Sequence, residues 1–161
     1  MTNQPDADPT RSNHLGPLRD LLQHMESDIA RLYAERGVTV RTRFSIVLIR
    51  LRHRGPMSVR ELAREVDVTH SAMSQTVAEL RRQGMVESAP GTDARTRTVS
   101  LTDRGRETVP FLEAEWRATE ASLAELEAEL PYPLTRVVAD IAAALRRRSF
   151  RDRIVANLAT P

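Results

Sequence analysis

Short polar side chains cluster in one stretch of the sequence, and their chemistry is hydrogen bonding. Hydroxyl and amide groups recur there at helical spacing, at Thr69, Ser71, Ser74 and Gln75. Such groups bond the edges of DNA bases, and a glutamine amide matches adenine with two hydrogen bonds. Serine catalysis would need an adjacent base, and His70 does not supply one to Ser71 because consecutive helix residues do not face each other. These residues therefore favour recognition over catalysis.

Other catalytic and metal-binding patterns are missing from the sequence. It contains no G-x-S-x-G segment and no glycine-rich phosphate loop. It has no cysteine, and its four histidines share no ligand spacing with carboxylates. We therefore expect neither an enzyme nor a bound metal or cofactor.

The charge is distributed unevenly along the chain. All 24 basic residues are arginine, and the formal net charge is only +2. Residues 36–106 hold 14 arginines against seven acids, whereas residues 107–129 hold seven acids and one arginine. A basic middle suits a polyanionic partner, although arginine abundance by itself also fits a GC-rich genome.

The pattern of apolar residues predicts a mainly α chain with a small β-hairpin wing. Apolar residues fall at helical spacing in most segments, and they alternate within 85–101, where a turn-rich loop separates two short strands. The expected parts are a disordered tail (1–14), a dimerisation helix (15–37), a winged helix-turn-helix domain (38–101), a long helix and a last helix that complete the dimerisation region (102–148), and a C-terminal tail (149–161).

Two short helices within that domain meet the requirements of a helix-turn-helix. Ser58 and Glu61 form a capping-box pattern at the start of the first helix, and Thr69 is the expected N-cap of the second. Ala63 is small enough for the helix crossing, and we expect Val68 to fill the gap at the turn. The second helix of such a motif enters the major groove, and a following hairpin places a cationic tip near the minor groove.

Three stretches resemble the multiple-antibiotic-resistance regulator (MarR) family. They are G-P-M-S-V-R-E-L-A from Gly55, V-T-H-S-A-M-S-Q-T-V-A-E-L-R-R-Q-G-M-V-E from Val68, and D-A-R-T-R-T-V-S-L-T-D-R-G from Asp93. The resemblance implies a homodimer that binds a near-palindromic operator in double-stranded DNA. A cytoplasmic location is expected because the sequence shows neither a membrane span nor a signal-peptide pattern. It also implies a repressor released by a small, aromatic effector. Gln75 departs from the basic residue that the family often has there, so the family's operator sequence does not carry over.

The resemblance and the polar face together give a set of predicted DNA contacts. Arg95 corresponds to the family's wing-tip arginine, and Asp93 to the acid that steadies it. The set comprises Ser58, Thr69, His70, Ser71, Ser74, Gln75, Arg81, Arg82, Asp93, Arg95 and Arg97. Arg81 and Arg82 fit phosphate contacts and a solvated face equally well, and Arg146–Arg148 fit a solvated helix end.

The family places its effector pocket where the dimer helices meet the DNA-binding lobe. The corresponding candidates are His24, Met25, Arg43, Phe44, Val47, Phe111 and Trp116, which also fit an ordinary core. A winged-helix module that has lost DNA binding is the main alternative function, but such a module would also lose its basic face and wing. No apolar run reaches the roughly 20 residues of a membrane span, and the N-terminus lacks a signal-peptide pattern.

Overall fold

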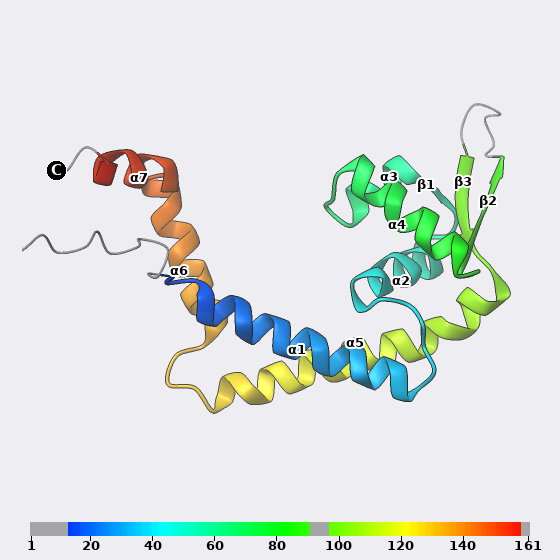
Figure 1. Cartoon of the computed structure of the whole chain (residues 1–161), viewed down its shortest axis with the longest axis horizontal. Coiled ribbons are helices and arrows are strands. Elements are labelled where there is room, and N and C mark those ends of the chain that lie inside the picture. Colours follow the sequence, from blue (N-terminus) through cyan, green and yellow to red (C-terminus); the bar gives the residue numbers. More distant parts are fainter. Residues whose placement is uncertain (1–12, 91–96, 159–161) are drawn as a thin grey trace, which may run out of the picture. The chain divides into compact units, whose positions relative to one another are not determined.

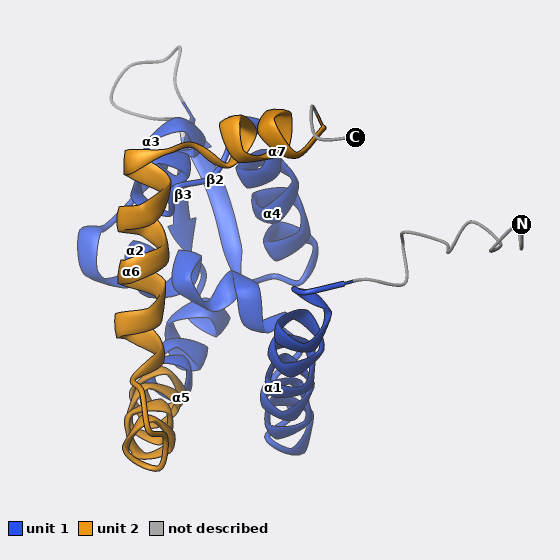
Figure 2. Cartoon of the chain, turned by 90° about the vertical axis from the view of Figure 1, so that its left-hand side faces the viewer, with its two compact units in different colours: residues 1–113 blue, residues 114–161 orange. Residues whose placement is uncertain are grey.

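The computed structural model describes residues 13–90 and 97–158, which form two compact units (Figures 1 and 2). The first unit spans residues 1–113 and the second 114–161, so helix α5 contributes to both. The elements in chain order are α1 (Gly16–Glu35), the 3-10 turn η2 (Thr42–Phe44), α2 (Ser45–Arg54), β1 (Met57–Ser58), α3 (Val59–Glu65), α4 (His70–Arg82), β2 (Val86–Pro90), β3 (Arg97–Leu101), α5 (Asp103–Ala128), α6 (Leu134–Arg147) and α7 (Phe150–Leu158). The mainly helical fold with a small wing is confirmed.

The sheet has three antiparallel strands in the order β1-β3-β2. Strand β2 pairs with β3 in the predicted hairpin, with Val86 opposite Leu101. Strand β1 was not predicted, because two residues are too short to show an alternating pattern. It pairs with the other edge of β3, with Met57 opposite Val99. The wing is thereby attached directly to the segment that leads into α3.

The core of the first unit lies between the helices and this sheet. Side chains from five elements are almost completely buried, namely Leu48 of α2, Leu62 of α3, Met73 and Leu80 of α4, Val99 of β3, and Val109 and Leu112 of α5. Helix α1 joins this core at its C-terminal end, where the Tyr33 ring packs edge-on against Phe111 at 5.3 Å between centroids. The helix-turn-helix is therefore held against a continuous apolar core.

The junction between the wing and α5 explains the L-T-D-R-G segment. The Thr102 hydroxyl accepts a hydrogen bond from the Gly105 amide at 3.1 Å and donates to the Gly84 carbonyl at 2.6 Å. A Cβ at Gly105 would clash with the Met85 carbonyl oxygen. Glycine is needed here because α5 starts directly against the backbone that follows α4.

The second unit contains one helix more than the sequence analysis expected. Residues 149–161 were expected to be a tail, but Phe150–Leu158 form helix α7. Its spacing of Phe150, Ile154 and Leu158 is helical, so the signal was present in the sequence. Within the described residues, no helix is both long enough and apolar enough to cross a membrane.

Candidate nucleic-acid interface

Both helices of the helix-turn-helix begin with the predicted caps. The Ser58 side chain accepts from the Glu61 amide at 3.3 Å, while the Glu61 carboxylate accepts from the Ser58 amide at 2.8 Å. The Ser58 hydroxyl also donates to the Glu61 carboxylate at 2.7 Å, and this bond together with the bond from the Ser58 amide lowers the pKa of Glu61. The Thr69 hydroxyl accepts from the Ala72 amide at 3.2 Å and caps α4. The hydroxyls of Ser58 and Thr69 thus fix the helix starts.

The turn between α3 and α4 differs from the expectation in one respect. Val68 does not fill a gap in the core, since its side chain is 43% exposed. The turn is instead closed by the backbone, where the Val68 amide donates to the Ala63 carbonyl at 2.9 Å. Asp67 has a φ of 54°, a left-handed conformation that aspartate tolerates better than most residues. Ala63 is buried at the helix crossing, as predicted.

Helix α4 has one buried and one exposed face. Met73, Val77 and Leu80 are buried at 1%, 6% and 0% exposure. The opposite face is exposed at His70, Ser71, Gln75, Ala78, Arg81 and Arg82, and Ser74 is half-buried. A rigid helix therefore presents short polar groups on its first turns and cations near its end, which is the arrangement that major-groove recognition requires.

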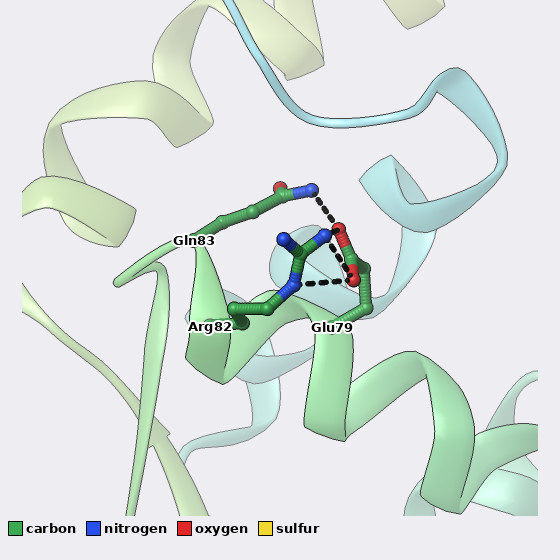
Figure 3. Close-up of polar contacts among 3 residues, drawn as sticks. All are labelled: Glu79, Arg82 and Gln83. Carbon is green, nitrogen blue, oxygen red and sulfur yellow. Dashed lines mark hydrogen bonds and ion pairs between the residues drawn. The ribbon is translucent and has the colours of Figure 1, made fainter.

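The two arginines at the end of α4 have different surroundings (Figure 3). Arg82 donates to both carboxylate oxygens of Glu79, with an Nη2–Oε1 distance of 2.6 Å, and Gln83 donates to the same carboxylate at 2.6 Å. The bonds from Arg82 and Gln83 lower the pKa of Glu79, and the bonds to Glu79 raise the pKa of Arg82. Arg81 makes no ion pair with any residue that the structure describes. Arg81 is therefore the free cation, whereas the charge of Arg82 is balanced locally.

The wing is described up to its two strand ends. Arg97 is exposed at the start of β3, and its guanidinium donates to the Ser88 carbonyl at 3.4 Å across the hairpin. Asp93 and Arg95, the predicted wing-tip residues, lie outside the described residues.

A cavity of about 510 Å³ lies within the first unit, directly beside α4. Its lining combines apolar side chains with two guanidiniums and one carboxylate, and consists of Arg41, Arg43, Phe44, Val47, Val66, Val68, Ala72, Met73, Gln75, Thr76 and Glu79. Its volume falls within the about 300–1,000 Å³ typical of ligand pockets. Gln75 belongs both to this lining and to the exposed face of α4.

Three of the seven residues predicted for an effector pocket line this cavity, namely Arg43, Phe44 and Val47. The exposed His24 ring instead lies 2.7 Å from the Asp20 carbonyl oxygen on its own helix, and Phe111 packs on Tyr33. Met25 is half-buried on α1, and Trp116 belongs to the second unit. Sequence reasoning missed Arg41, Thr76 and Glu79. Their only signals were an arginine three residues before Phe44 and a helical repeat along the side of α4.

The described residues contain no group of histidine, aspartate and glutamate side chains that could hold a metal ion. The carboxylates of Glu61 and Glu79 are engaged in a helix cap and an ion pair. The site can therefore bind a ligand through hydrogen-bond donors and acceptors, through cations and within a cavity.

Comparisons with known proteins agree with this geometry. The model of the MarR family matches residues 36–96, which run from the end of α1 to the wing. No curated protein sequence matches the chain significantly.

Solved structures match over most of the chain. The transcriptional regulator MosR of M. tuberculosis, solved in complex with DNA, is 26% identical with a TM-score of 0.57, over 85% of this chain and 99% of that one. MepR of S. aureus, also solved with DNA, is 14% identical with a TM-score of 0.64, over 84% of this chain and 98% of that one. The heme sensor PefR of Streptococcus agalactiae, solved with heme, is 19% identical with a TM-score of 0.62, over 88% of this chain and 97% of that one. The MarR family model thus covers the winged helix-turn-helix part of this chain, residues 36–96, and solved structures of transcriptional regulators share its fold over most of its length.

Proposed function

We propose that the chain is a dimeric DNA-binding repressor that a small molecule releases from its operator. The observation that carries the proposal is helix α4, which is fixed on its apolar side by Met73 and Leu80 and free on its polar side. Ser71, Ser74 and Gln75 would bond base edges, and Arg81 would bind a phosphate. The DNA complexes of MosR and MepR support the same use of this fold.

Dimerisation is supported by apolar stripes that remain uncovered in the described chain. Helix α6 exposes every member of its stripe, namely Leu134, Val137, Val138, Ile141 and Leu145. Helix α1 exposes Leu18, Leu21 and Leu22. Large exposed apolar patches of this kind mark protein interfaces, and a two-fold dimer would present two α4 helices about 34 Å apart to a near-palindromic operator.

The two arginines at the end of α4 provide a matched test of DNA binding. Arg81→Ala should weaken binding to operator and random DNA alike and reduce the salt slope by about two for the dimer, because each subunit loses one phosphate contact. Arg82→Ala, at the neighbouring exposed position, should have a smaller effect because Glu79 already balances Arg82. The measurement is a fluorescence-anisotropy titration at several salt concentrations.

Gln75→Ala should act differently, by flattening base preference at one position in each half-site while leaving the salt slope nearly unchanged. A bidentate base contact is worth about 1–3 kcal/mol. DNA binding by wild type that is independent of salt, or that is unaffected by all three variants, would exclude this use of α4.

Effector release is supported by the cavity beside α4. Arg41 and Arg43 favour an anion, and Phe44, Val47 and Met73 favour an aromatic body. A ligand there would contact Gln75, so binding of ligand and of DNA would be linked through one side chain. Benzoate is a suitable probe: it should raise the melting temperature of wild type and weaken operator binding. Benzyl alcohol should have less effect, and Arg43→Gln should abolish the difference between the two compounds.

A further inference from the structure

Charge is segregated along the second unit. Residues 118–130, at the end of α5, contain Glu120, Glu125, Glu127 and Glu129 and no basic residue. Residues 146–153, at the junction of α6 and α7, contain five arginines and one aspartate. Glu127 accepts a hydrogen bond from the Thr135 amide at 2.9 Å. The other three acids are exposed, and none forms an ion pair with a described residue.

The basic segment is equally short of partners. Arg146 and Arg147 are exposed and form no ion pair with any residue in the described ranges. Arg151 has only a 3.8 Å contact with the neighbouring Asp152. The two segments therefore carry opposite charges that are not neutralised within the described chain.

Helix α6 keeps these two segments apart within one chain. It spans 14 residues from Leu134 to Arg147, which corresponds to a length of about 21 Å. In Figures 1 and 2, α6 leaves the end of α5 without running back along it. The Debye length at physiological ionic strength is about 8 Å, so attraction across this distance within one chain is screened. The acidic and basic segments can therefore pair effectively only when they come from two different chains.

Both segments also carry apolar side chains that need covering. Helix α7 exposes Phe150, Ile154 and Leu158, at 65%, 45% and 79%. These residues are spaced four apart and so share one face. The acidic segment exposes Leu126 in α5, and Leu130 just beyond the helix, at 44% and 45%. Each segment is thus an apolar stripe bordered by one sign of charge, and the two signs are opposite.

We propose that α7 and the end of α6 of one chain dock on the acidic end of α5 of a second copy. By two-fold symmetry, the contact is made twice. Arg146, Arg147 and Arg151 would face Glu120, Glu125 and Glu129 of the second copy, around a centre formed by Phe150 and Leu126. The inference rests on the proposed dimer and adds the residues that set its register and choice of partner.

Complementary charge affects specificity and salt dependence more than it affects the total affinity. Two acidic α5 ends brought together would repel each other, as would two basic α6–α7 junctions. The favoured arrangement therefore pairs unlike segments. Dimerisation of this chain is accordingly expected to weaken with added salt, whereas an interface formed only by apolar stripes would not.

The experiment measures the dimer dissociation constant of the full chain by sedimentation velocity at 50 mM and 500 mM NaCl. One variant combines Arg146→Glu, Arg147→Glu and Arg151→Glu, and the other combines Glu120→Arg, Glu125→Arg and Glu129→Arg. Each alone should dimerise at least about tenfold more weakly at low salt. An equimolar mixture should form heterodimers with close to wild-type affinity, because the reversed charges again meet their complements.

A matched control reverses three exposed arginines of the first unit, Arg52→Glu, Arg54→Glu and Arg60→Glu. It changes the net charge equally and should leave dimerisation nearly unchanged. Circular dichroism verifies that each variant folds. If a charge-reversal variant does not fold, the same positions are changed to glutamine, and the dissociation constants of that variant and of wild type at the two salt concentrations test the contact.

The outcomes separate this inference from the proposed function. A wild-type chain that is monomeric at micromolar concentration overturns the dimer itself. A wild-type dimer that is insensitive to salt, with variants no weaker than the control and no gain on mixing, overturns only the contact between α7 and α5.

Discussion

Helices α4 and α6 are both amphipathic and almost equal in length, with 13 and 14 residues, but their apolar faces end up in different environments. In α4, Met73 and Leu80 are buried at 1% and 0% exposure, against neighbours supplied by the same chain. In α6, Val138 and Ile141 remain 57% and 55% exposed. An amphipathic pattern therefore indicates that the apolar face of a helix must be buried. Only the tertiary structure shows whether other residues of the same chain bury it.

The comparison predicts different consequences of substitution in the two helices. The predictions below are ordered by their expected effect on the stability of the first unit. All can be measured by hydrogen exchange of α4 amides, which reports local and global opening of this unit separately.

The largest effect is expected at the centre of the first unit. Leu80→Ala should lower the free energy of unfolding by about 2–5 kcal/mol, because it removes buried methyl groups and leaves a cavity. The loss should not depend on protein concentration, since the surrounding core belongs to one chain. Ala78→Ser, on the exposed face of the same helix, is the control and should stay within about 0.5 kcal/mol of wild type. A similar loss in both variants would mean that α4 is not seated as described.

The features that could be predicted from the sequence are those that local interactions determine. The capping box of Ser58 and Glu61 spans four residues, and the buried face of α4 repeats every three or four residues. The hairpin was visible because the alternation ending at Val99 and Leu101 follows a turn-rich loop. Each of these signals lies within a single element or a pair of adjacent elements.

The features that were missed depend on contacts between distant segments. Strand β1 forms only because Met57 pairs with Val99 of β3, 42 residues later in the chain. Arg41 and the α4 side of the cavity were missed because the cavity joins Arg41, before η2, to Thr76 and Glu79 of α4. Val68 was misplaced because an apolar residue in a turn was assumed to point inward. The DNA contacts themselves remain predictions, and those of Asp93 and Arg95 fall outside the described residues.

A moderate effect is expected at the start of α3. Ser58→Ala should cost about 1 kcal/mol because it removes the side-chain cap of the helix. Ser58 also donates to the Glu61 carboxylate through its hydroxyl and its amide, and these bonds hold the folded-state pKa of Glu61 below its ordinary value of 4.5. Their stabilising effect is present above pH 4.5 and is lost as the pH falls through the folded-state pKa, whereas the cap bond from the Glu61 amide does not titrate. The difference between wild type and variant should therefore be largest at neutral pH and shrink at pH 3.5. Urea titrations at both pH values test this, and a difference that grows on acidification contradicts it.

A smaller effect, of opposite sign, is expected at the turn. Asp67→Gly should stabilise the first unit by less than about 1 kcal/mol, since relief of the left-handed backbone strain is partly offset by the greater entropy of the unfolded chain. Asp67→Val at the same position should destabilise, because a β-branched residue resists positive φ. If both substitutions were destabilising to the same degree, the Asp67 carboxylate would have to contribute an interaction that outweighs the strain.

The smallest effect on the first unit, and the sharpest contrast with Leu80, is expected from Ile141→Asp in α6. Because Ile141 is 55% exposed in the described chain, the stability of α4 in the monomer should change by less than about 0.5 kcal/mol. The proposed dimer buries this residue on both subunits. Each buried side chain contributes about 1.5–3 kcal/mol, so two losses should raise the dimer dissociation constant by at least about 100-fold. Ala139→Asp changes the charge equally on the polar side of the same helix and should leave dimerisation intact. If the two aspartate variants dimerised equally well, the exposed stripe of α6 would be covered by something other than a second copy of this chain.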